Sequence, residues 1–306
     1  YSVEPSSRTF SEKAKLEKEK LSKTKKSVPF SYSFSTELFS MKTPGKVYET
    51  PSEANERQFF SPELTNGTFY TVKLLSKYNQ LNGQSGQRYL EKIDSLLFEN
   101  IPGKIISKDR IKLDGFHGLD IVNKTRTGDY QRYQIVETPL HLLILKMGGK
   151  HDFVQKESER FFNSIELKKP TKEWNEVATI KKDFVVKIPS YYHIKGNTKA
   201  TSMYTHPEIE AFDVSDSSYY LVKRAALHDF EFIEEDDFEL KRLAKKFYKE
   251  LEIDSIETNL DMSQTYPTSL SYGKTKEGKD LTIKIVVKGA YYYLLATTSA
   301  SKKKSQ

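Results

Sequence analysis

Alternating apolar and polar positions recur along much of the chain, and this period of two is typical of strands with one buried face. The longest such segments cover residues 131–147 and 280–298. Each is interrupted midway by residues that favour a turn, Thr-Pro at 138–139 and Lys-Gly at 288–289. Both segments are therefore predicted to form β-hairpins.

Three other segments place apolar residues three and four positions apart, the spacing of one helix face. The second of these helices is expected to start at Asp152 as N-cap, with Gln155 three positions later as in a capping box. The apolar positions of the three predicted helices are Tyr89, Ile93, Leu96 and Leu97, then Val154, Phe161 and Phe162, then Leu240, Leu243, Ala244, Phe247, Tyr248 and Leu251.

The two halves of the chain resemble each other when the sequence is aligned with itself. Residues 39–44 and 184–189 share the pattern Phe-x-hydrophobic-Lys-x-Pro at an offset of 145. An offset of 150 aligns the two predicted hairpins and places Leu145 on Leu295. Because several separate blocks match in the same order, we predict a tandem duplication.

The order of elements in each half predicts an α+β fold with two tandem domains, each an antiparallel sheet flanked by helices. Trp174 is expected to start the first strand of the second domain. The second half stops where the closing helix of the first would begin, so we expect a fragment, or a terminal helix supplied from elsewhere. The predicted parts are a charged tether at 1–28, a first domain at 29–168, a linker with the first strand at 169–182, a second domain at 183–301 and a basic tail at 302–306.

The net charge of +7 belongs to the ends of the chain. Residues 1–30 carry eight basic and four acidic side chains, and residues 302–304 are three lysines, whereas residues 31–301 carry 38 of each sign. A neutral body argues against binding to nucleic acid, which needs a cationic surface. The absence of cysteine excludes disulfides and thiolate chemistry and fits either redox compartment.

No pattern in the sequence predicts a catalytic or metal-binding site. The six histidines lack the spacing of a metal or acid–base motif. The acidic run at 234–237 precedes a predicted helix, where the helix dipole favours negative charge. Neither a Gly-x-Ser-x-Gly turn nor a phosphate-binding glycine loop occurs. We therefore predict no catalytic residue, no metal, no cofactor and no small-molecule substrate.

Several of these patterns together resemble the PsbP-like fold family. They are the Phe-x-hydrophobic-x-x-Pro strand, the Tyr-x-Val strand, a glycine-flanked strand pair and a helix ending in Phe-Phe-Asn-Ser-Ile at 161–165. The family includes the extrinsic protein of photosystem II, a Ran-binding protein of yeast and many bacterial envelope proteins. The resemblance covers residues 31–167 more closely than 174–301. Residues 113–118 resemble the family's Gly-x-x-Gly segment, whereas the second half has Leu-Asp-Met-Ser-Gln at 260–264. The resemblance implies helix-flanked sheets and a largely non-enzymatic binding module.

Tyrosines supply the candidate partner contacts, because this residue is enriched in protein interfaces. Tyr191 and Tyr192 follow Pro189 closely, so we predict that they lie in an exposed loop. Phe116 and His117 are the other two candidate contacts. Packing inside a sheet is the alternative for the tyrosine-rich segments.

The sequence thus predicts a non-enzymatic, protein-binding accessory or scaffold subunit of a bacterial cell-envelope complex. Its expected location is extracytoplasmic, in the periplasm or on the envelope by peripheral or anchored membrane association, with the cytoplasm as the alternative. A carrier for a lipid or other apolar ligand, held between sheet and helix, is the second class of function. An enzyme is the third.

Overall fold

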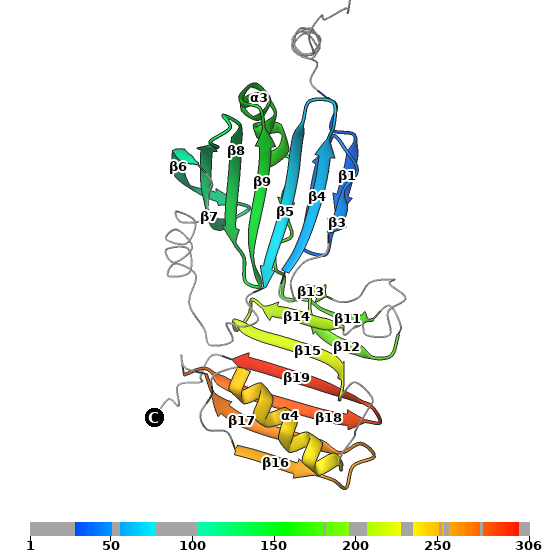
Figure 1. The fold of residues 1–306 in the computed structure, drawn as a ribbon. Coiled ribbons are helices and arrows are strands. Elements are labelled where there is room, and N and C mark those ends of the chain that lie inside the picture. The colour runs from blue at the N-terminus through cyan, green and yellow to red at the C-terminus, as the bar shows by residue number, and fades with distance from the viewer. Residues whose placement is uncertain are drawn as a thin grey trace, which may run out of the picture.

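The computed structural model contains two large antiparallel sheets, one beyond the other, with the strands of the second running across the direction of those of the first (Figure 1). Two smaller sheets and two helices complete the described part of the chain. The structure describes residues 28–50, 56–76, 103–179, 182–195, 207–227, 235–250, 253, 257–275 and 278–299.

The first large sheet has seven strands in the order β3-β4-β5-β9-β8-β7-β6, and every neighbouring pair is antiparallel. The long segment predicted as a hairpin forms its centre, as β8 and β9. The strands are β3 (Tyr48–Thr50), β4 (Glu56–Glu63), β5 (Thr68–Ser76), β6 (Lys104–Leu113), β7 (Phe116–Lys124), β8 (Tyr130–Glu137) and β9 (His141–Gly149).

The second large sheet also has seven strands, in the order β13-β14-β15-β19-β18-β17-β16. This order repeats that of the first sheet, and three strands, β15, β18 and β19, start at or next to the position 150 residues after β5, β8 and β9. The second predicted hairpin is confirmed as β18 and β19. The strands are β13 (Tyr191–Lys195), β14 (Glu208–Asp213), β15 (Ser218–Ala226), β16 (Glu257–Asp261), β17 (Thr268–Lys274), β18 (Asp280–Lys288) and β19 (Tyr291–Ser299).

A small sheet packs on one face of each large sheet. In the first, Phe39 and Met41 of β2 join Val72 of β5 in one buried core. In the second, Val177 and Ile188 of a two-stranded hairpin pack with the second sheet. The small sheets consist of β1 (Tyr32–Ser35), β2 (Phe39–Thr43) and β10 (Glu166–Leu167), and of β11 (Trp174–Ala178) and β12 (Val185–Pro189). The strand predicted to start at Trp174 is therefore confirmed.

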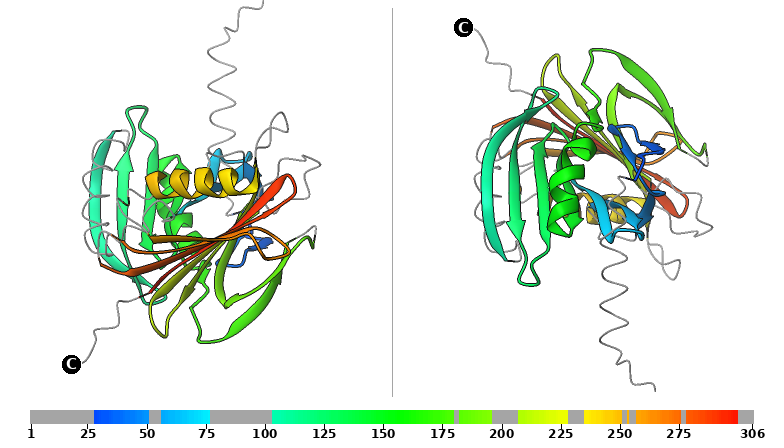
Figure 2. Two further views of the ribbon diagram at one scale, coloured as in Figure 1. Left: turned by 90° about the horizontal axis from the view of Figure 1, so that it is seen from below. Right: turned by 90° about the horizontal axis from the view of Figure 1, so that it is seen from above.

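The two described helices cover non-equivalent faces of the two large sheets: α3 shares a face with the small sheet that packs on its large sheet, and α4 does not. Helix α3 (His151–Phe162) packs beside β2 on the first sheet, where Phe161 joins the core. Helix α4 (Asp236–Glu250) lies on the second sheet, on the face away from the β11–β12 hairpin (Figure 2). The predicted helix at 240–251 is confirmed over the described residues, and Leu240, Leu243, Ala244 and Phe247 are buried.

The predicted α+β class is wrong, because the described residues are mostly β, with four antiparallel sheets and only two helices. More of the chain forms strands than the sequence predicted. Segments such as β6 consist of polar and charged residues at a sheet edge, so they show no alternation of apolar and polar positions. The helix predicted at 89–97, residues 1–27 of the tether and the tail at 302–306 lie outside the described residues.

The start of α3 also differs from the prediction. Lys150 is the N-cap residue, and its side chain makes no capping hydrogen bond. Asp152 lies in the first turn instead, where its carboxylate faces the positive end of the helix dipole. The acidic residue therefore favours the helix start through charge and not as the cap.

Candidate functional site

One face of the second sheet carries partly exposed apolar side chains among polar ones such as Thr282 and Lys284. Leu295 on β19 is 37% exposed, whereas Leu145, at the same position of the first sheet, is 0% exposed. Leu145 is buried because α3 and β2 cover that face of the first sheet. On the second sheet the only described helix, α4, lies on the other face.

Strand pairing brings the apolar residues of this face together. Val286 pairs with Tyr293, and Lys284 pairs with both Leu270 and Leu295. Tyr272, two residues beyond Leu270 on β17, is 48% exposed. The ring of Phe184, from the loop before β12, contacts Tyr293 at 5.8 Å between ring centroids. We call the set Leu270, Tyr272, Val286, Tyr293 and Leu295 the open face.

The predicted loop at Tyr191 and Tyr192 is wrong, because both residues belong to β13. We call each large sheet with its small sheet and helix a unit. Tyr191 pairs with Phe212 of β14 and is buried in the core of the first unit. This burial raises the pKa of its hydroxyl to about 12. Tyr192 is half-buried against the β11–β12 hairpin. Tyr191 is thus a contact between the two halves of this chain, which ties the second sheet to the first.

Phe116 and His117 start β7, directly after the two-residue turn at Asp114 and Gly115. Both turn residues have positive φ, 50° and 92°, as a type I′ hairpin turn requires. The segment therefore closes a hairpin. Phe116 is half-buried at the edge of the core that includes Tyr191, and His117 is exposed. Neither belongs to the open face, and no residue of the open face was among the candidate partner contacts.

A buried polar cluster joins the two units. His193 Nδ1 lies 2.7 Å from Glu37 Oε1, and the Arg57 guanidinium donates to the same oxygen at 3.1 Å. Burial lowers the pKa of His193, against the effect of the Glu37 carboxylate. Burial would raise the pKa of Glu37, but the His193 hydrogen bond and the Arg57 charge outweigh it and lower that pKa. The Glu37–Arg57 ion pair therefore lies beside an imidazole whose neutral form is favoured by burial.

The second part of the cluster surrounds Glu210 on β14. Its carboxylate accepts a hydrogen bond from the Ser76 hydroxyl, and His141 Nε2 lies 3.6 Å from its other oxygen. The rings of His141 and His193 lie edge to face at 4.5 Å between centroids. Glu210 is 2% exposed, and burial raises its pKa to about 7, although the Ser76 hydrogen bond opposes the shift.

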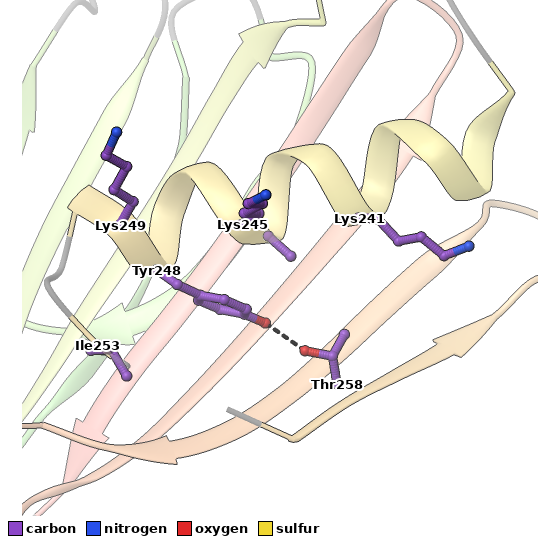
Figure 3. Close-up of a pocket in the computed structure, with 7 residues that line it drawn as sticks. Lys241, Lys245, Tyr248, Lys249, Ile253 and Thr258 are labelled. Carbon is purple, nitrogen blue, oxygen red and sulfur yellow. Dashed lines mark hydrogen bonds between the residues drawn. The ribbon is translucent and has the colours of Figure 1, made fainter. Parts of the chain in front are cut away.

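A pocket of about 540 Å³ lies between α4 and β16 (Figure 3). The Tyr248 hydroxyl lies 2.8 Å from Thr258 Oγ1, which links the helix to the edge strand. Three lysines one helical turn apart stand along the rim, and Lys241 is bound to Asp237 at 2.9 Å. The lining residues are Lys241, Ala244, Lys245, Tyr248, Lys249, Ile253 and Thr258. A mainly apolar wall with ammonium groups at its rim suits an amphiphile with an anionic head.

The described ranges hold no group of three or more His, Cys, Asp or Glu side chains placed to hold a metal ion. In the same ranges no helix is long and apolar enough to cross a bilayer. Models of known protein families give no match to the sequence, and a comparison with curated proteins gives none. The structure thus defines the chain as a pair of topologically equivalent seven-stranded antiparallel sheets.

Proposed function

We propose that this protein is a non-enzymatic binding protein and that its open face binds another protein, so that it acts as an accessory or scaffold subunit. The observation that supports this is the difference between equivalent positions of the two sheets. Leu145 is fully buried under α3, while Leu295 and Tyr272 remain accessible. Clustered exposed apolar side chains mark interaction sites, because covering them removes apolar area from water.

The proposed setting is a bacterial cell-envelope complex, reached by peripheral or anchored association with the membrane. Support for this setting comes from the sequence resemblance to PsbP-like envelope proteins. The balanced charge of residues 31–301 is consistent with a protein partner in place of nucleic acid.

The test is affinity purification of the tagged full-length chain from its own cells, followed by mass spectrometry. Leu295→Glu places a charge in the open face, and Leu64→Glu makes the same change at a 90% exposed turn of the first sheet. We expect a partner that is stoichiometric with the wild type and with Leu64→Glu and absent with Leu295→Glu. Equal recovery with both variants, each folded by circular dichroism, would remove the open face from the proposal.

A carrier function is the second candidate, favoured by the pocket between α4 and β16. An anionic amphiphile would place its tail along Ala244 and Ile253 and its head near Lys245 and Lys249. Native mass spectrometry of protein from its own cells tests this directly. A bound lipid that is lost in the Lys245→Glu, Lys249→Glu double variant would support the carrier, and a ligand-free wild-type protein would exclude it.

A further inference from the structure

The open face sits where the first sheet carries α3. On the first sheet, α3 packs on β8 and β9, beside the small β1-β2-β10 sheet. On the second sheet the β11–β12 hairpin packs mainly over β14 and β15, and the open face lies on β17, β18 and β19. The space beside the small sheet is therefore filled by a helix in the first unit, whereas in the second unit no described helix occupies it.

The side chains of α3 show which occupant fits this position. Its buried residues include Val154, and Ser158, Phe161 and Phe162 follow it by four, seven and eight positions. This spacing places them on one helix face. The facing residues Val136, Leu143 and Leu145 correspond to Val286, Tyr293 and Leu295 of the open face at an offset of 150. The same kind of apolar stripe would meet the same rows of the second sheet.

Backbone hydrogen bonding favours a helix over an extended segment. The strands beneath the open face already pair with their neighbours, so the face offers side chains and no free strand edge. An extended peptide lying there would leave its own N–H and C=O groups without partners in a buried contact. A helix satisfies these groups internally and presents only side chains.

The charge on this side of the second sheet indicates which polar residue the bound helix should carry. On the first sheet Arg132 of β8 reaches α3, where it donates to Ser158 Oγ at 3.1 Å and to Glu159 Oε1 at 2.5 Å. Lys284, on β18 of the second sheet, is an exposed cation that lies between Leu270 and Leu295 of the open face. A carboxylate on the occupant would pair with Lys284 as Glu159 pairs with Arg132.

We infer that the open face binds an amphipathic helix of a partner protein, with an apolar stripe spaced like that of α3 and an acidic residue facing Lys284. This inference rests on the proposed protein-binding function and specifies the partner's structure. The α3 position on the first sheet is the template for the docked helix, which lies across β17, β18 and β19.

The test is photo-crosslinking in the protein's own cells. A benzophenone amino acid replaces Tyr272 in the full-length chain, and a control chain carries it at Tyr32, which is equally exposed on β1 of the first unit. We expect crosslinks from position 272, and not from 32, to a partner peptide with apolar residues at i, i+3 or i+4, and i+7, which is helical by circular dichroism. Lys284→Glu should lower the yield at least about tenfold, because it faces one carboxylate with another. Reversing the partner's acidic residue to lysine should restore it.

Crosslinks to an extended segment, to a loop or to a second copy of this chain would overturn the helix inference and leave a protein-binding face. A position 272 that crosslinks to no protein would instead contradict the proposed function itself. The two failures are therefore distinguishable in one experiment.

Discussion

At the scale of single residues, folding raises the pKa of the Glu210 carboxyl. Its ordinary pKa of 4.5 rises to about 7 because β14 buries it against the first unit. Between these values the folded state holds a proton that the unfolded state has released, so stability falls as pH rises through this window. His193 changes the pH dependence of stability in the opposite direction. Its pKa is lowered from 6.5, so its contribution is lost as pH falls below that value.

Glu210→Gln should therefore stabilise the protein at high pH and not at low pH. Glutamine keeps an acceptor for the Ser76 hydroxyl and removes the charge that burial penalises. We expect a gain in unfolding free energy of up to about 3 kcal/mol at pH 8.5, and little change at pH 4.5. Urea unfolding of both proteins at these pH values measures the difference, and the unchanged His193 affects both alike.

Glu176→Gln is the matched control for this experiment, because Glu176 is exposed on β11. It should leave the pH dependence of stability unchanged. A Glu210→Gln protein that follows the wild-type pH profile would show that Glu210 is not buried as described, and that the units do not close over it.

At the scale of elements, the two sheets provide an internal comparison, because Leu145 and Leu295 occupy equivalent positions on β9 and β19. Leu145→Ala should cost about 2–5 kcal/mol, since it opens a cavity beneath α3. Leu295→Ala should cost under about 1 kcal/mol, because its side chain is already partly in water. Denaturant unfolding of the isolated variants measures both. Equal losses would mean that Leu295 is as well covered as Leu145.

Local sequence patterns predicted those elements whose own residues show a clear hydrophobic period. The hairpins of β8–β9 and β18–β19 followed from alternation and turn residues, and α4 from its apolar spacing. Tyr191 was misplaced because Pro189 suggests a loop, whereas pairing with β14 and burial in the first core make it a strand residue. Tertiary contact decided that position, and no local pattern could show it.

The candidate site was predictable only in part. The offset of 150 aligns Leu145 with Leu295, so the equivalence of the two sheet faces is visible in the sequence. Their different exposure depends on what covers each face in three dimensions. The buried cluster of Glu37, His193 and Glu210 joins residues from separate strands of both units, and no spacing in the sequence reveals such a contact.

At the scale of the whole molecule, the two units are joined by shared burial. Tyr191 and Phe212 of the second unit pack into the core of the first. The His193 and Glu37 contact adds a polar link at the same junction. The hairpin side of the second sheet, which includes the open face, thus keeps a fixed relation to the first unit, with α4 on the opposite side (Figure 2).

The measurement that tests the central proposal most directly is thiol labelling, because the chain has no native cysteine. Single variants Leu295→Cys, in the open face, and Thr127→Cys, in the exposed β7–β8 turn, are labelled with a maleimide. The rate is compared between gently lysed cells that retain the native complex and the purified chain. We predict that Leu295→Cys is labelled at least about tenfold more slowly in the complex, while Thr127→Cys reacts equally in both. Equal labelling of Leu295→Cys in the two states would contradict a partner-covered open face.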